Sequence, residues 1–160
     1  MDGDVWVAGV DGCHGGWLVA LLRLRQHNRA PAGIRFHLCP RVADILALEE
    51  RPAVIAVDMP VGLLDFPAPG GRGCDRAARR LLGRRASSVF PPPTRPALAA
   101  TGYRQAIALN RRGLSRQAYN ILPKIRELDD MMTPALQETV FEAHPELAFR
   151  ELAGHALRFN

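Results

Sequence analysis

The stretch GVDGCHGGW, residues 9–17, closes the first apolar run of the chain with an aspartate and several glycines. Residues 5–10 form a short apolar run that is rich in valine, which predicts a strand. Glycines 12, 15 and 16 predict a tight turn, and residues 17–24 predict the second strand of a hairpin. An isolated carboxylate beside a buried strand is costly unless a turn amide, a basic side chain or a metal ion pairs with it. The stretch therefore poses the question of what Asp11 binds.

A second aspartate ends another apolar run. The segment AVIAVDMP, residues 53–60, predicts a buried strand that stops at Asp58. Between the two runs, apolar and polar residues alternate over residues 34–38, which predicts a third strand. The apolar residues of the segment 41–50 have the spacing of a short amphipathic helix. The order of strand, strand, strand, helix and strand indicates a mixed sheet in an α/β domain. Ligands of open α/β sheets bind where the strands end, which is where both aspartates are expected.

The second half of the chain predicts mainly helices. Residues 60–100 are rich in proline and glycine around a basic helix at 74–88, and we expect an irregular surface insertion within one domain that spans residues 1–160. Residues 101–113 predict a helix stopped by Gly113. Residues 115–132 predict another, with Ser115 as its N-cap and Pro123 interrupting it. Residues 138–146 predict a last strand, and a final helix begins at Pro145.

Composition indicates a globular protein. The chain has 160 residues, of which 48% are hydrophobic, and no apolar run has the length of a membrane span. The N-terminus lacks a signal-peptide pattern, so we expect a cytoplasmic protein with no membrane partner. Three widely spaced cysteines form no CxxC pair, which predicts reduced thiols. The net charge of +5 permits a nucleic acid or a small phosphoester as partner, although a genome that favours arginine codons explains it equally well.

Three acids stand at or near the ends of predicted strands: Asp11, Asp58 and Glu142. If these strands are neighbours, the three carboxylates converge on one edge of the sheet. Hard oxygen ligands of this kind favour Mg²⁺ or Mn²⁺. Two such ions about 4 Å apart stabilise the attacking and leaving oxygens of a phosphoryl displacement.

Each of these residues also has a simpler explanation. Asp11 before a glycine can form a turn, and Asp58 can accept hydrogen bonds from turn amides. Glu142 can be an ordinary exposed residue of a strand. His144 can cap the helix that follows it, and Glu146 suits the positive N-terminus of that helix without any chemistry.

The segment GRRASSVFPPP, residues 83–93, adds candidate phosphate ligands. Arg84 and Arg85 can offer bidentate donors, and Ser87 and Ser88 can donate hydrogen bonds to the same group. A solvated arginine face is the alternative. Lys124 is the sole lysine among 21 basic residues, and its compact ammonium could lie near phosphate.

Five motifs in order carry a resemblance to a known family: GVDGCHGGW, IAVDMPVGL, GRRASSVFPPP, SRQAYNILPKIRELD and FEAHPELAF. Together they resemble the domain of unknown function 429, DUF429, over about residues 7–149. That family is described as predicted nucleases with a ribonuclease-H-like fold. The resemblance implies a mixed five-stranded sheet whose first three strands are antiparallel and whose first and fourth strands are neighbours.

The resemblance also implies roles for individual residues. It carries metal binding onto Asp11 and Asp58, with Glu142 as the third acid and with His144 and Glu146 as further candidates. We expect His144 or Lys124 to assist proton transfer or to stabilise charge. Gly12 and its neighbouring glycines would let a phosphate-bearing ligand approach the backbone.

The end of the chain departs from the family pattern. Members continue past the HPE motif into helices with an acidic DALDA-like motif, which this sequence lacks before Asn160. We expect either a fragment or a shortened member. The leading hypothesis is a metal-dependent nuclease in which one ion activates water and a second stabilises the leaving oxygen. The alternatives are a nucleotide- or phosphate-binding protein, as in sugar kinases and actin-like ATPases of this fold, and a non-catalytic binding module.

Overall fold

The computed structural model describes residues 4–154. Their contacts divide the chain into two compact units. The first unit holds residues up to Met59 together with Asp130–Ala143, and the second holds Pro60–Asp129 and the residues from His144 onward. The segment at 60–100, expected as an insertion, lies in the second unit with the helices that follow it.

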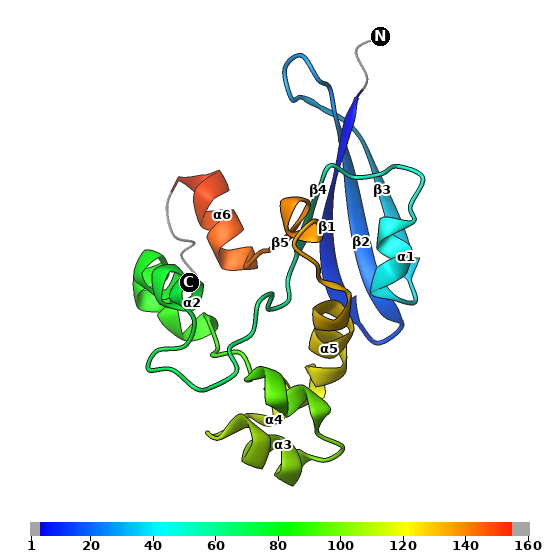
Figure 1. The fold of residues 1–160 in the computed structure, drawn as a ribbon. Coiled ribbons are helices and arrows are strands. Elements are labelled where there is room, and N and C mark those ends of the chain that lie inside the picture. The colour runs from blue at the N-terminus through cyan, green and yellow to red at the C-terminus, as the bar shows by residue number, and fades with distance from the viewer. Residues whose placement is uncertain (1–3, 155–160) are drawn as a thin grey trace. The chain divides into compact units, whose positions relative to one another are not determined.

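The first unit is a five-stranded sheet with the order β3-β2-β1-β4-β5 (Figure 1). Its strands are β1 (Val5–Cys13), β2 (Gly16–Leu24), β3 (Pro31–Cys39), β4 (Val54–Val57) and β5 (Val140–Glu142). The pairs β1–β2 and β2–β3 are antiparallel, while β1–β4 and β4–β5 are parallel. The expected mixed sheet, with the first and fourth strands as neighbours, is therefore confirmed.

The opening hairpin is longer than expected. β1 continues through Asp11 and Gly12 to Cys13, which pairs with Gly16. The turn thus consists of His14 and Gly15 alone. The prediction that Gly12 and Gly16 belong to the turn was wrong, because Gly12 pairs with Trp17 and Gly16 pairs with Cys13 inside the ladder.

One face of the sheet is buried and the other is largely exposed. Alternate residues on β1 and β2 point into the core, among them Val10, Trp17 and Val19, and the last two are fully buried. Helix α1 (Val42–Leu46) packs on β2 and β3 and buries Val42 and Ile45. The opposite face exposes six large apolar side chains: Leu18, Ile34, Phe36, Leu38, Val54 and Phe141.

The first unit also contains the short 3₁₀ helix η3 (Leu136–Glu138), and the second unit contains the other helices. They are α2 (Gly73–Leu82), η1 (Gly83–Ser88), η2 (Arg95–Ala99), α3 (Tyr103–Asn110), α4 (Arg116–Asn120), α5 (Leu122–Met131, mostly in this unit) and α6 (Pro145–Ala153). A small core joins Ala78, Leu82 and Val89, with Leu147 of α6 packed against it. The basic helix expected at 74–88 is α2 followed by the 3₁₀ helix η1, because Gly83 ends α2 at a positive φ of 53°.

Local sequence signals account for several helix ends. The Ser115 hydroxyl accepts a hydrogen bond from the Ala118 amide at 3.0 Å, which confirms the expected N-cap. The helix of residues 115–132 is interrupted at Ile121, two residues before Pro123, as expected. Pro145 occupies the first turn of α6. By contrast, α3 ends at Asn110, three residues before Gly113, because Arg111 adopts the left-handed conformation.

Two further expectations concern thiols and membranes. Cys13, Cys39 and Cys74, the cysteines of the described range, form no disulfide. Among residues 4–154, no helix combines the length and the apolar character needed to cross a membrane.

Candidate functional site

Asp11 and Asp58 lie side by side at the end of the β1–β4 ladder. Val10 pairs with Val57, and the Asp58 amide donates to the Val10 carbonyl at 2.9 Å, so the register brings Asp58 level with Asp11. Both aspartates follow a buried valine and are exposed, so they lie on the opposite face from the core. Neighbouring parallel strands are about 4.8 Å apart, which is close enough for two carboxylates to share one cation.

Glu142 lies at the same edge of the sheet but on the other face. It pairs with Val57, and paired residues of neighbouring strands point to the same side. The register therefore assigns Glu142 to the side of Val57 and the two aspartates to the opposite side. Consistent with this, the part of the chain that the structure describes contains no group of three acidic, histidine or cysteine side chains arranged to hold a metal ion.

Open space lies beside Asp11 on its face of the sheet. Within residues 4–154 its carboxylate makes no hydrogen bond or ion pair, so it does not hold the hairpin together. On the same face of the sheet, the preceding pair of residues is Gly9 and Ala56. A methyl group added at Gly9 would meet no atom within 4 Å. The two aspartates therefore stand beside open space, which is what a bound ion with its water and substrate ligands requires.

A second cluster joins four of the residues singled out in the sequence. Arg85 of η1 binds Glu146 of α6 through two parallel contacts, one from Nη2 to Oε1 and one of 2.8 Å from Nε to Oε2. The Ser88 hydroxyl lies 3.1 Å from Glu146 Oε2 and 2.9 Å from the Arg85 carbonyl, either of which it can donate to. His144 Nε2 lies 3.3 Å from the Ser88 carbonyl. This cluster fastens η1 to the start of α6.

The remaining candidates are dispersed. Arg84 and Ser87 are exposed on η1. Lys124 lies on α5 with its Nζ 3.9 Å from Glu127 Oε2, one turn away on the same helix. In this cluster Glu146 binds the guanidinium of Arg85, the group that was expected to contact phosphate.

The Arg85–Glu146 pair should make stability depend on pH. Hydrogen bonds from Arg85 hold the pKa of Glu146 below its ordinary value, and Ser88 and the charge of His144 act in the same direction while burial opposes them. A lowered pKa in the folded state adds stability above the unfolded pKa of about 4.3, and this stability is lost as the pH falls through the folded value. Glu146→Gln should therefore unfold more easily than the parent at neutral pH, and this difference in stability should be smaller at about pH 3.

Denaturant unfolding at both pH values measures this effect. Glu151→Gln, at an exposed position on the same helix, is the matched control and should leave the difference between the two pH values unchanged. A loss of stability in Glu146→Gln that is equal at both pH values would contradict the assignment.

Comparison with protein families identifies the chain. The family model described as "Protein of unknown function (DUF429)" matches residues 9–159. The chain belongs to the DUF429 family. Comparison with curated proteins and comparison with solved structures give no match. The match spans both units of this DUF429 protein and includes the paired aspartates and the Arg85–Glu146 cluster.

Proposed function

We propose that this DUF429 protein is a metal-dependent phosphodiester hydrolase of the ribonuclease-H-like class, acting on nucleic acid or a smaller phosphoester. The observation that carries the proposal is the placement of Asp11 and Asp58 on one face of neighbouring parallel strands. The strand order, with three antiparallel strands followed by two parallel ones, supports the same class.

The two aspartates suit Mg²⁺ or Mn²⁺ bound together with a substrate. Mg²⁺ is commonly held by one or two carboxylates, while waters and substrate phosphates complete its coordination. Divalent cations in such sites polarise a phosphoryl oxygen and lower the pKa of bound water. Asp11 and Asp58 would hold and orient the ion. Gly9 and Ala56 lie next to the aspartates on the same face, and their small size would leave room for the phosphate beside the ion.

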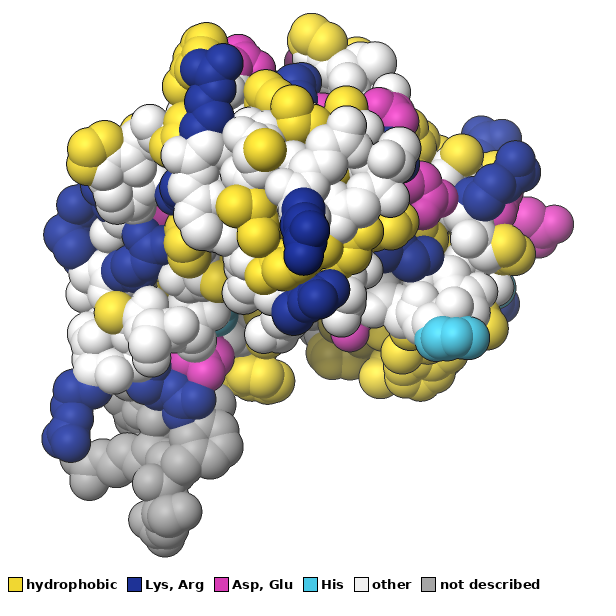
Figure 2. Space-filling model, turned by 90° about the horizontal axis from the view of Figure 1, so that it is seen from below, with side chains coloured by type: hydrophobic (Ala, Val, Ile, Leu, Met, Phe, Trp, Pro, Cys, Tyr) yellow, Lys and Arg dark blue, Asp and Glu magenta, His cyan; other side chains and the backbone are white. Residues whose placement is uncertain are grey.

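The distribution of positive charge bears on how a substrate would be held. On the face seen in Figure 2, lysine and arginine side chains are scattered, with acidic and apolar side chains between them. A scattered arrangement favours contacts between individual arginines and phosphates over a continuous basic stripe on this face.

Hydrolysis of bis(p-nitrophenyl) phosphate, single-stranded DNA and structured RNA in the presence of Mn²⁺ tests the proposal. Mutation of a residue that only supports a metal ligand commonly lowers metal affinity or activity by about 10- to 100-fold. Removal of a direct ligand in Asp58→Asn should therefore lower the rate of hydrolysis by about 100-fold or more. Asp65→Asn removes a carboxylate that is 72% exposed in the second unit and should leave the rate unchanged. Equal rates in Asp58→Asn and the parent would refute the assignment.

A second candidate is a phosphate-binding protein without turnover. The observation that favours it is the position of Glu142, because two carboxylates on one face are fewer than the three expected of the nuclease site. Binding of Mn²⁺ without hydrolysis of any of the three substrates would select this candidate.

A further inference from the structure

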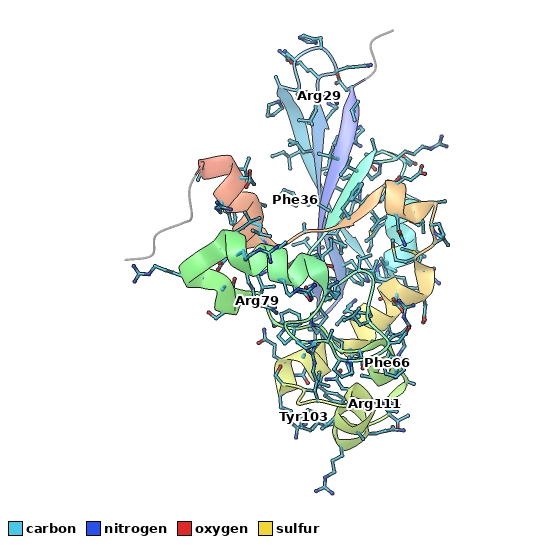
Figure 3. The ribbon with its side chains drawn as sticks, turned by 60° about the vertical axis from the view of Figure 1, so that its left-hand side comes forward. Arg29, Phe36, Phe66, Arg79, Tyr103 and Arg111 are labelled. Carbon is cyan, nitrogen blue, oxygen red and sulfur yellow. The ribbon has the colours of Figure 1, made fainter. Side chains whose placement is uncertain are left out.

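The second unit contains an open groove of about 580 Å³, within the size range of small-molecule sites. The turn at Gly70 and Gly71, helix α2, helix η1 and the segment after η1 form its walls. The side chains that determine its chemistry are Arg79, Ser87, Phe90 and Arg112. Figure 3 shows Arg79 on α2.

Both arginines of the groove are held by backbone carbonyls. Arg79 donates from Nη1 to the Gly70 carbonyl at 2.6 Å and from Nε to the Val89 carbonyl at 3.1 Å. Arg112 donates from Nη2 to the Pro92 carbonyl at 2.5 Å. A guanidinium has five N–H donors, so each arginine keeps donors for a further acceptor.

The charges of Arg79 and Arg112 lack an acidic partner in the range 4–154. Within the described part of the chain, neither Arg79 nor Arg112 forms an ion pair with a carboxylate. Two acids of the same unit are bound elsewhere: Asp75 pairs with Arg72 at 2.6 Å, and Glu146 pairs with Arg85. Among residues 4–154, the groove therefore presents two positioned cations without an acidic partner.

The neighbouring groups fit a phosphorylated ligand. Ser87 is exposed and supplies a hydroxyl donor at the groove. The Phe90 side chain is 40% exposed and offers a flat apolar surface. Arginine pairs are well suited to phosphate because planar guanidinium groups match its oxygens bidentately.

We propose that this groove binds the phosphate group of a small molecule that also carries a planar ring. Arg79 and Arg112 bind the phosphate, Ser87 donates a hydrogen bond to it, and Phe90 contacts the ring. The proposal rests on the second unit alone and requires neither the metal site nor hydrolysis.

Calorimetric titration of the full chain with phenyl phosphate, in the absence of divalent metal, tests this site. Phenyl phosphate should bind more tightly than inorganic phosphate, and Phe90→Ala should remove the difference. Arg112→Gln should weaken binding by about 10- to 100-fold, because it removes charge-assisted hydrogen bonds that contribute to the free energy of binding. Ser87→Asp should abolish binding, because it places a negative charge in the groove at an exposed position.

Arg104→Gln is the matched control, since it removes an exposed cation of the same unit that does not line the groove. It should bind phenyl phosphate as the parent does. The proposal is overturned if the parent fails to bind phenyl phosphate, if Ser87→Asp binds it as well as the parent, or if Arg104→Gln weakens binding as much as Arg112→Gln. Because no metal is present, failure here leaves the paired-aspartate proposal intact, and failure of hydrolysis leaves this one intact.

Discussion

Gly16→Ala is expected to destabilise the sheet by about 3 kcal/mol or more. Gly16 begins β2 at a φ of 137°, a conformation that residues with a side chain rarely adopt. A Cβ at this position would lie 2.2 Å from the Cys39 carbonyl oxygen and 2.9 Å from the Pro40 Cα. Both are backbone atoms at the end of the neighbouring strand, so relief requires the β2–β3 ladder to shift.

Denaturant unfolding followed by tryptophan fluorescence measures this prediction, because fully buried Trp17 is the next residue. Gly9→Ala is the control. It replaces a glycine of the same hairpin at a position where a Cβ meets no atom within 4 Å, so its stability should lie close to that of the parent. Equal stability of Gly16→Ala and Gly9→Ala would contradict the close approach of the β2 backbone at Gly16 to the end of β3.

Asn110→Ala is expected to cost the second unit about 2–4 kcal/mol. Asn110 is fully buried at the end of α3. Its Oδ1 accepts hydrogen bonds from the Thr94 amide at 2.7 Å and from the Thr94 hydroxyl at 3.2 Å. Its Nδ2 donates to the carbonyls of Arg112 and Gly113, both at 3.3 Å. Alanine would leave these groups without their partner, and a buried unsatisfied amide is costly.

Hydrogen exchange of the Thr94 and α3 amides measures this loss within the second unit. Asn120→Ala, at the exposed end of α4, is the control and should change exchange little. Unchanged protection of the Thr94 amide in Asn110→Ala would contradict the role of the side chain as the link between these segments.

Much of the fold follows from local signals in the sequence. The valine-rich runs before Asp11 and Asp58 predict two of the buried strands because apolar β-branched residues suit a sheet interior. Pro123 and Ser115 predict helix boundaries because proline lacks an amide donor and the serine hydroxyl accepts one. The pairing of the first and fourth strands came from the family resemblance, since no local pattern specifies which strands become neighbours.

The features that local signals miss depend on register and on distant partners. The face on which Glu142 lies is set by its pairing with Val57, and a shift of one residue would reverse it. Arg79 and Arg112 lie 33 positions apart and meet at one groove only in the folded unit. Arg85 looked like a phosphate ligand because its partner, Glu146, is 61 residues away. The carbonyls that position the two groove arginines belong to the proline- and glycine-rich segment, whose composition predicts irregular backbone but not which side chains bind to it.

The proposed function requires that Asp11 and Asp58 together hold a divalent cation. Calorimetric titration of Mn²⁺ into the parent chain and into the double variant Asp11→Asn/Asp58→Asn tests it most directly, with circular dichroism to verify that both are folded. We expect saturable binding to the parent and none to the double variant, whose amides keep the shape of the carboxylates and remove their charge. Absence of Mn²⁺ binding to the folded parent, or equal binding to the two proteins, would contradict it.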